Sequence, residues 1–176
     1  MITADLLDDI LSSLNEKIPL CRELVNHGQC EWNCCLKSDS YILFLPGEWE
    51  SAIALGYEVA QYEILDESYF GGKKVDARQD GCCSAAIRGS RAYKSLDCRL
   101  YPYWFQIEGI LQLIHALSCP IIQLGRPIES HREQAVRVAE KLMGDPDVRE
   151  FFRNARMVNY GPTGSHSSLA HQNGSH

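Results

Sequence analysis

Eight cysteines in 176 residues set this chain apart, because most of them do not fit the usual place of a structural thiol. The stretch CEWNCC, residues 30–35, holds three thiols within six positions. Buried structural cysteines are expected on the apolar faces of helices and strands. Cys21 fits that description, whereas the others fall in predicted loops or at the ends of predicted elements. These others are Cys30, Cys34, Cys35, Cys82, Cys83, Cys98 and Cys119.

The chemistry open to these thiols depends on the compartment. The N-terminal stretch MITADLLDDILSSLNEK is acidic and amphipathic, and it lacks the cationic start and apolar block of a secretory signal. We therefore expect a cytoplasmic protein, in which cysteines seldom rest in structural disulfides. The sequence contains no apolar run long enough to cross a bilayer. A net charge of −6 argues against binding to nucleic-acid backbones. We expect neither a membrane nor a nucleic-acid partner.

Hydrophobic periodicity predicts an α+β fold with one small antiparallel sheet, helices at both ends, and long loops. The predicted strands are residues 41–45 and 57–65, and a hairpin over 104–117 that turns near Glu108-Gly109. The predicted helices are residues 4–16 with Thr3 as N-cap, 19–27, about 47–56, 130–143, and one that starts at Asp145-Pro146. In the helix from Ser130, we expect Val136, Ala139 and Leu142 to face inward.

Residues 71–99 contain the turn-forming sequences Gly-Gly, Asp-Gly and Arg-Gly-Ser and few periodic apolar positions. This pattern predicts a loop. Loops of that length in compact domains usually have a function or are restrained by a bound group or by other parts of the chain. The chain length suits one domain. We therefore expect one folded domain over residues 1–158, followed by a disordered polar tail, residues 159–176.

The spacing of the thiols indicates a metal site. The first cluster lets at least two sulfurs converge on one centre, and thiolates about 2.3 Å from zinc need such clustering plus one or two distant donors. Cys82, Cys83, Cys98 and Cys119 are available as the distant donors. The chain has no CxxC pair, which argues against a zinc ribbon or a thioredoxin-like site. Such a cysteine metal cluster would pin the long loops and make residues 1–158 a cysteine-cluster metal-binding domain. Spacing alone leaves the metal open.

The order of the motifs is more specific than their spacing. CEWNCC is followed by LPGEWE at 45–50, by CRLYP at 98–102, and by Cys119-Pro120 with Gly125 soon after. This order resembles the YkgJ-like family of zinc- or iron-chelating cysteine-cluster proteins. The resemblance covers about residues 30–128 and implies a metal site rather than an activity. It leaves open which cysteine of each adjacent pair binds.

Seven candidate thiols exceed the needs of one tetrahedral centre. The set we prefer is Cys30, Cys34 or Cys35, Cys98, and one of Cys82, Cys83 and Cys119, which would hold zinc, iron or an iron–sulfur cluster. Four thiolates around zinc leave about two negative charges that are costly to bury without compensation. Arg88, Arg91, Lys94 and Arg99 could supply that compensation, with only Asp97 opposing them.

Two other classes of function stay open from the sequence. The first is an iron- or thiol-dependent enzyme acting on a small anionic substrate held by the same basic residues. The sequence shows no distinct general base and no His/carboxylate set to support it. The second is a redox sensor, in which adjacent cysteines cycle between thiol and disulfide.

Overall fold

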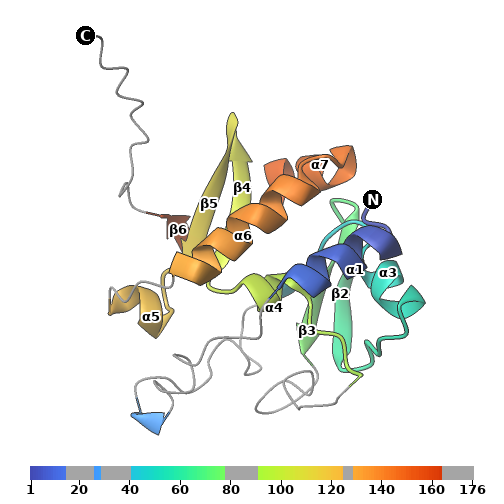
Figure 1. The fold of residues 1–176 in the computed structure, drawn as a ribbon, viewed down its shortest axis with the longest axis horizontal. Helices are drawn as coiled ribbons and strands as arrows, with labels where there is room; N and C mark the ends of the chain where they lie inside the picture. The colour runs from blue at the N-terminus through green and yellow to red at the C-terminus, as the bar shows by residue number, and fades with distance from the viewer. Residues whose placement is uncertain (15–25, 29–40, 78–90, 125–128, 164–176) are drawn as a thin grey trace.

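The computed structural model of the chain describes residues 1–14, 26–28, 41–77, 91–124 and 129–163. These residues form helices and two antiparallel sheets of three strands each (Figure 1). The predicted α+β class is confirmed, with the strands divided between two small sheets. The first sheet has the order β1–β3–β2, with β1 at Ile42–Phe44, β2 at Tyr62–Tyr69 and β3 at Gly72–Ala77. The second has the order β4–β5–β6, with β4 at Tyr103–Glu108, β5 at Ile110–Ala116 and β6 at Tyr160–Pro162.

The helices at the start of the chain follow their local signals. Helix α1 spans Ala4–Ser13 and is capped by Thr3, whose Oγ1 accepts a hydrogen bond of 3.3 Å from the Leu6 N–H. Its buried side chains are Leu7 and Ile10, as an amphipathic helix requires. Helix α3 spans Glu48–Ala54. The predicted strand and helix around LPGEWE are therefore confirmed, whereas the helix predicted for 19–27 lies almost wholly outside the described residues.

The prediction of a loop over residues 71–99 is wrong at both of its ends. Strand β3 occupies Gly72–Ala77, and helix α4 occupies Leu96–Leu100. Strand β3 lacks a clear apolar period in its sequence, GKKVDA, and forms as the central strand because it is paired on both sides. Its Gly72 is required for packing, since an added Cβ would lie 2.1 Å from the Phe44 carbonyl oxygen. Strand β2 begins five residues later than the strand predicted from residue 57.

The predicted hairpin is confirmed as β4 and β5. Its register runs from Glu108 opposite Ile110 to Tyr103 opposite His115, with the turn at Gly109. Strand β6 pairs with β5, so Ile114 lies opposite Pro162. The first residues of the predicted polar tail, 160–162, therefore belong to a sheet, while residues 164–176 lie outside the described residues.

Two helices cover the second sheet. Helix α6, Glu129–Leu142, buries residues that recur at helical spacing: His131, Gln134, Ala135, Val138, Ala139 and Leu142. The prediction that Val136 faces inward is wrong, because Val136 sits one residue off this face and is 39% exposed. Helix α7, Pro146–Asn154, packs against β4. Its predicted start is confirmed: the Oδ1 atom of Asp145 accepts hydrogen bonds from the N–H groups of Asp147 and Val148.

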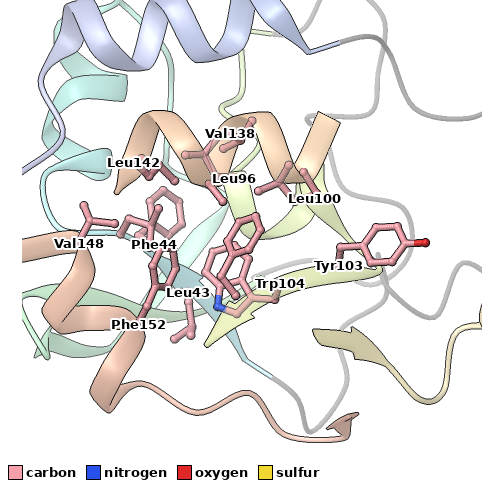
Figure 2. Packing of buried hydrophobic residues seen from close by; sticks show 14 of the residues in the cluster. Leu43, Phe44, Leu96, Leu100, Tyr103, Trp104, Val138, Leu142, Val148 and Phe152 are labelled. Carbon is pink, nitrogen blue, oxygen red and sulfur yellow. The ribbon is translucent and has the colours of Figure 1, made fainter. Parts of the chain in front are cut away.

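One hydrophobic cluster joins both sheets and the helices (Figure 2). Helix α4 packs against β1 of the first sheet and against β4 and α6 of the second half (Figure 1). Its Leu96 and Leu100 are fully buried among the residues of this cluster. The short helix that carries Cys98 therefore lies in the interior and connects the first sheet to the second sheet and α6. Within the described ranges, no helix combines the length and the apolar character that crossing a membrane requires.

Candidate functional site

Cys98 is partly buried on α4, a helix of only five residues whose N-terminal half is bonded to side chains. Ser95 is the N-cap, and its Oγ accepts a hydrogen bond of 3.2 Å from the Cys98 N–H. The Leu96 N–H donates to the Oε1 atom of Glu48 at 2.7 Å. The Oδ2 atom of Asp97 accepts a hydrogen bond of 2.9 Å from the Leu43 N–H. Helix α4 is thus tied to β1 and to the start of α3.

Glu48 is completely buried, with an exposed fraction of 0%. Besides the Leu96 N–H, its carboxylate accepts hydrogen bonds from the Leu45 N–H at 2.8 Å and from the Tyr93 hydroxyl at 3.0 Å. Burial raises the pKa of Glu48 to about 7; the three hydrogen bonds lower it, and the nearby charge of Asp97 raises it further. The LPGEWE motif therefore supplies an internal acid that joins the turn after β1 to the segment leading into α4.

The C-terminal end of α4 is fixed by His131 of α6. The Nε2 atom of His131 lies 3.1 Å from the Leu100 carbonyl oxygen and 3.0 Å from that of Tyr101. Because both partners are acceptors, Nε2 is the protonated nitrogen and donates to them. The sequence placed this residue inside a capping box, SHRE. Its spacing from Ala135, Val138 and Leu142 was the signal that it faces the core.

Cys119 is the N-cap residue of α5, Pro120–Gln123, and is 4% exposed. Its N–H donates to the Ala116 carbonyl oxygen at 3.3 Å, which turns the chain back after β5. Burial raises the pKa of Tyr103; nearby Arg132 lowers it, while Glu129 and Cys119 raise it. Tyr103 and Cys119 both belong to the one hydrophobic cluster, in which the Tyr103 side chain carries a hydroxyl. Figure 2 shows this hydroxyl directed away from the side chains of Leu100 and Trp104.

The two described cysteines flank the same end of the β4–β5 hairpin. Pairing closes with Tyr103 opposite His115 and continues through a 2.8 Å hydrogen bond from the Ala116 N–H to the Pro102 carbonyl oxygen. Cys98 precedes Pro102 by four residues, and Cys119 follows Ala116 by three. Both cysteines therefore lie near the end of the hairpin that is opposite its turn at Gly109.

The remaining predicted ligands lie outside the described residues: Cys30, Cys34, Cys35, Cys82 and Cys83. In the part of the chain that the structure describes, no three His, Cys, Asp or Glu residues form a group that could hold a metal ion. Cys98 and Cys119 alone do not make such a group.

Two described residues flank the segments that carry the other cysteines: Tyr41, just before β1, and Ala77, at the end of β3. Both lie at one end of the first sheet. Ile42 pairs with Val75 and Tyr62 pairs with Ala77, so the start of β1 lies beside the end of β3. Burial raises the pKa of Tyr41, the residue before β1, to about 12, with smaller contributions that include the charge of Asp97. Asp97 precedes Cys98 and accepts its hydrogen bond from Leu43, the middle residue of β1, so α4 lies beside this strand.

The basic residues that the sequence singled out are partly engaged in the fold. Arg91 donates from Nη2 to the Gly56 carbonyl oxygen at 3.1 Å. Arg99 donates from Nε to the Lys94 carbonyl oxygen at 2.7 Å, and its guanidinium lies 5.8 Å from the centre of the Tyr93 ring. Asp97 does not oppose them from solvent, because it is 5% exposed and bonds to β1. Arg88 lies outside the described residues.

Comparison of the chain with protein-family models, with curated proteins and with solved structures found no match. The fold class therefore follows from the described elements alone. The resemblance to the YkgJ-like family rests on its motifs.

Proposed function

We propose that this chain is a cysteine-cluster metal-binding protein that holds zinc, iron or an iron–sulfur centre through thiolates from loops far apart in sequence. The preferred donors are Cys30, Cys34 or Cys35, Cys98, and one of Cys82, Cys83 and Cys119. One observation carries the proposal. Helix α4, with Cys98, is bonded to β1, and the chain leads into both other cysteine segments from one end of that same sheet.

Chain reach supports this convergence. Cys35 precedes Tyr41 by six residues, and Cys82 follows Ala77 by five. An extended chain spans at most about 3.6 Å per residue, so six residues can reach about 22 Å and five residues about 18 Å. Neighbouring strands are about 5 Å apart, which keeps the two attachment points close together. Thiols from three segments can therefore meet beside α4.

The donors that the structure describes suit a thiolate centre. Cys98 is partly buried, so a metal could reach it, and its helix is fixed at both ends by hydrogen bonds. Arg99 follows Cys98 directly and Lys94 precedes it by four residues, so the proposal assigns these cations to offset negative charge on the sulfurs. A closed zinc centre would contribute its binding free energy to folding, whereas an iron–sulfur centre would carry electrons.

The proposal is tested by purifying the full chain without oxygen and measuring its metal content and visible spectrum. Brown protein with broad visible absorption would identify an iron–sulfur centre, and colourless protein with bound zinc a closed structural site. Cys98→Ser should lose metal. Cys21→Ser, at the cysteine assigned to packing, should keep it. Wild-type protein without metal but with reversibly oxidised thiols would contradict the proposal and favour the redox sensor.

A further inference from the structure

We infer that Glu48 is a positioning residue that fixes the direction of the Cys98 thiol. Glu48 acts on the thiol through Leu96, two residues before Cys98 on the same helix. The inference rests on the proposed function where it concerns metal binding. Where it concerns the orientation of the thiol, it rests on geometry alone.

The geometry is that of a carboxylate joining two distant parts of the chain. Glu48 accepts from the Leu45 N–H within its own turn, and from the Leu96 N–H 48 residues away. The Tyr93 hydroxyl adds a third bond from the segment that enters α4. All three donors bond to one carboxylate that has no exposed surface. Such hydrogen bonds to a carboxylate are short, directional and stronger than neutral ones.

Helix α4 needs this kind of bond because its length gives it little order of its own. Helices of five residues are not stable in isolation, so their orientation comes from tertiary contacts. Leu96 and Leu100, four residues apart, bury one face of α4. Apolar packing buries this face of α4, but it does not fix the rotation of the helix about its axis, because the hydrophobic effect is not directional. The bonds from Glu48 and His131 set the rotation of the helix and therefore where Cys98 points.

A buried carboxylate at this position costs free energy that packing alone would not require. A fully apolar residue in place of Glu48 would leave the Leu45 and Leu96 N–H groups without this acceptor. The two motifs LPGEWE and CRLYP are thus physically linked through Glu48 and the helix that carries Cys98. The first motif supplies the acceptor, and the second supplies the helix that it orients.

The test compares Glu48→Ala with a matched control, Leu7→Ala, which removes a fully buried side chain from α1. The alkylation rate of each cysteine is followed by peptide mass spectrometry in the full chain as purified, under native conditions, with bound metal quantified in each sample. We expect Glu48→Ala to speed alkylation of Cys98 about tenfold and that of Cys119 hardly at all. Leu7→Ala should not single out Cys98, even at equal loss of global stability.

If Glu48→Ala does not fold, Tyr93→Phe provides the same comparison, because it removes only one of the three bonds. It should speed alkylation of Cys98 about threefold. Equal effects of the Glu48 or Tyr93 variant and of Leu7→Ala on Cys98 would overturn the inference and leave the metal proposal standing. Wild-type protein without metal would overturn the metal proposal, while the selective change at Cys98 would still decide the role of Glu48.

Discussion

The carboxylate of Asp97 accepts a hydrogen bond of 2.9 Å from the backbone N–H of Leu43. Asp97 is the residue before Cys98, and Leu43 is the middle residue of β1, an edge strand of the first sheet. This bond keeps the carboxylate of Asp97 buried inside the fold, bonded to the backbone of β1. Together with Glu48 and His131, it holds α4 between the two sheets by directional bonds from three elements.

Glu48 should make the protein less stable as the pH rises from about 5 to about 8. Burial raises its pKa from 4.5 to about 7 in the folded state, so the folded protein keeps a proton that the unfolded chain has lost. That contribution is fully present below pH 4.5 and is lost as the pH passes 7. A shift of this size corresponds to about 3 kcal/mol in the free energy of unfolding. Urea unfolding across this pH range measures it.

The control is Glu48→Gln, which cannot ionise. Its amide group places a donor against the Leu45 or Leu96 N–H, and this penalty does not depend on pH. The difference in unfolding free energy between wild type and Glu48→Gln should therefore shrink as the pH rises. The charge of Asp97 raises the pKa of Glu48, and the Tyr93 hydroxyl donates to Glu48, yet both residues are present in the two proteins. An identical pH dependence in both would contradict the assignment.

Gly47 should be far less tolerant of alanine than Gly109, although both have positive φ, +81° and +77°. A Cβ at Gly47 would lie 2.4 Å from the Ile2 carbonyl oxygen, whereas a Cβ at Gly109 would meet no atom within 4 Å. Alanine at Gly109 should cost about 1 kcal/mol of backbone strain. Alanine at Gly47 should cost at least about 2 kcal/mol more, because backbone must move. Equal losses in urea unfolding would show that the turn before Glu48 is not sterically fixed.

His131→Ala should loosen the end of α4 that faces α6. The variant removes the donor that contacts the Leu100 and Tyr101 carbonyl oxygens, at a cost of about 1–3 kcal/mol. Amide exchange of Arg99 and Tyr101, whose N–H groups close the turns of α4, should speed up. Val136→Ala, at an exposed position on the same helix, should change stability by less than about 0.5 kcal/mol. Unaltered exchange in His131→Ala would contradict the role assigned to this histidine.

The elements predicted correctly are those that local sequence determines. Thr3 and Asp145 cap their helices through their own side chains, and Gly109 turns a hairpin whose register is local. The sequence predicts a loop where strand β3 and helix α4 form, because partners distant in sequence fix both elements. A strand with Gly72 and two lysines has no apolar period, and its pairing with β1 and β2 decides its conformation.

The candidate site shows the same division. Thiol chemistry singled out Cys98 and Cys119 from the sequence, and the structure sets them at one end of a hairpin. No sequence signal indicates that Glu48 and Asp97 are buried, since acidic residues are usually exposed and these two bond to backbone N–H groups elsewhere in the chain. Such roles become visible only once the chain has folded.

Strand β6 should contribute measurably to stability, in contrast to the expectation that disorder begins at residue 159. A chain ending at Thr163 keeps the pairing of β6 with β5, and a chain ending at Asn159 loses it. The shorter chain also loses the bond from the Thr163 hydroxyl to the Leu113 carbonyl oxygen and uncovers Ile114. We expect it to be about 1–2 kcal/mol less stable in urea unfolding. Equal stability would make β6 dispensable.

X-ray absorption spectroscopy at the metal edge of anaerobically purified protein tests the proposed cysteine centre most directly. A centre held by thiolates should show a shell of about four sulfur atoms about 2.3 Å from the metal. The number of sulfur neighbours should fall in Cys98→Ser. A first shell made only of nitrogen and oxygen atoms, or protein that carries no metal, would contradict the proposal.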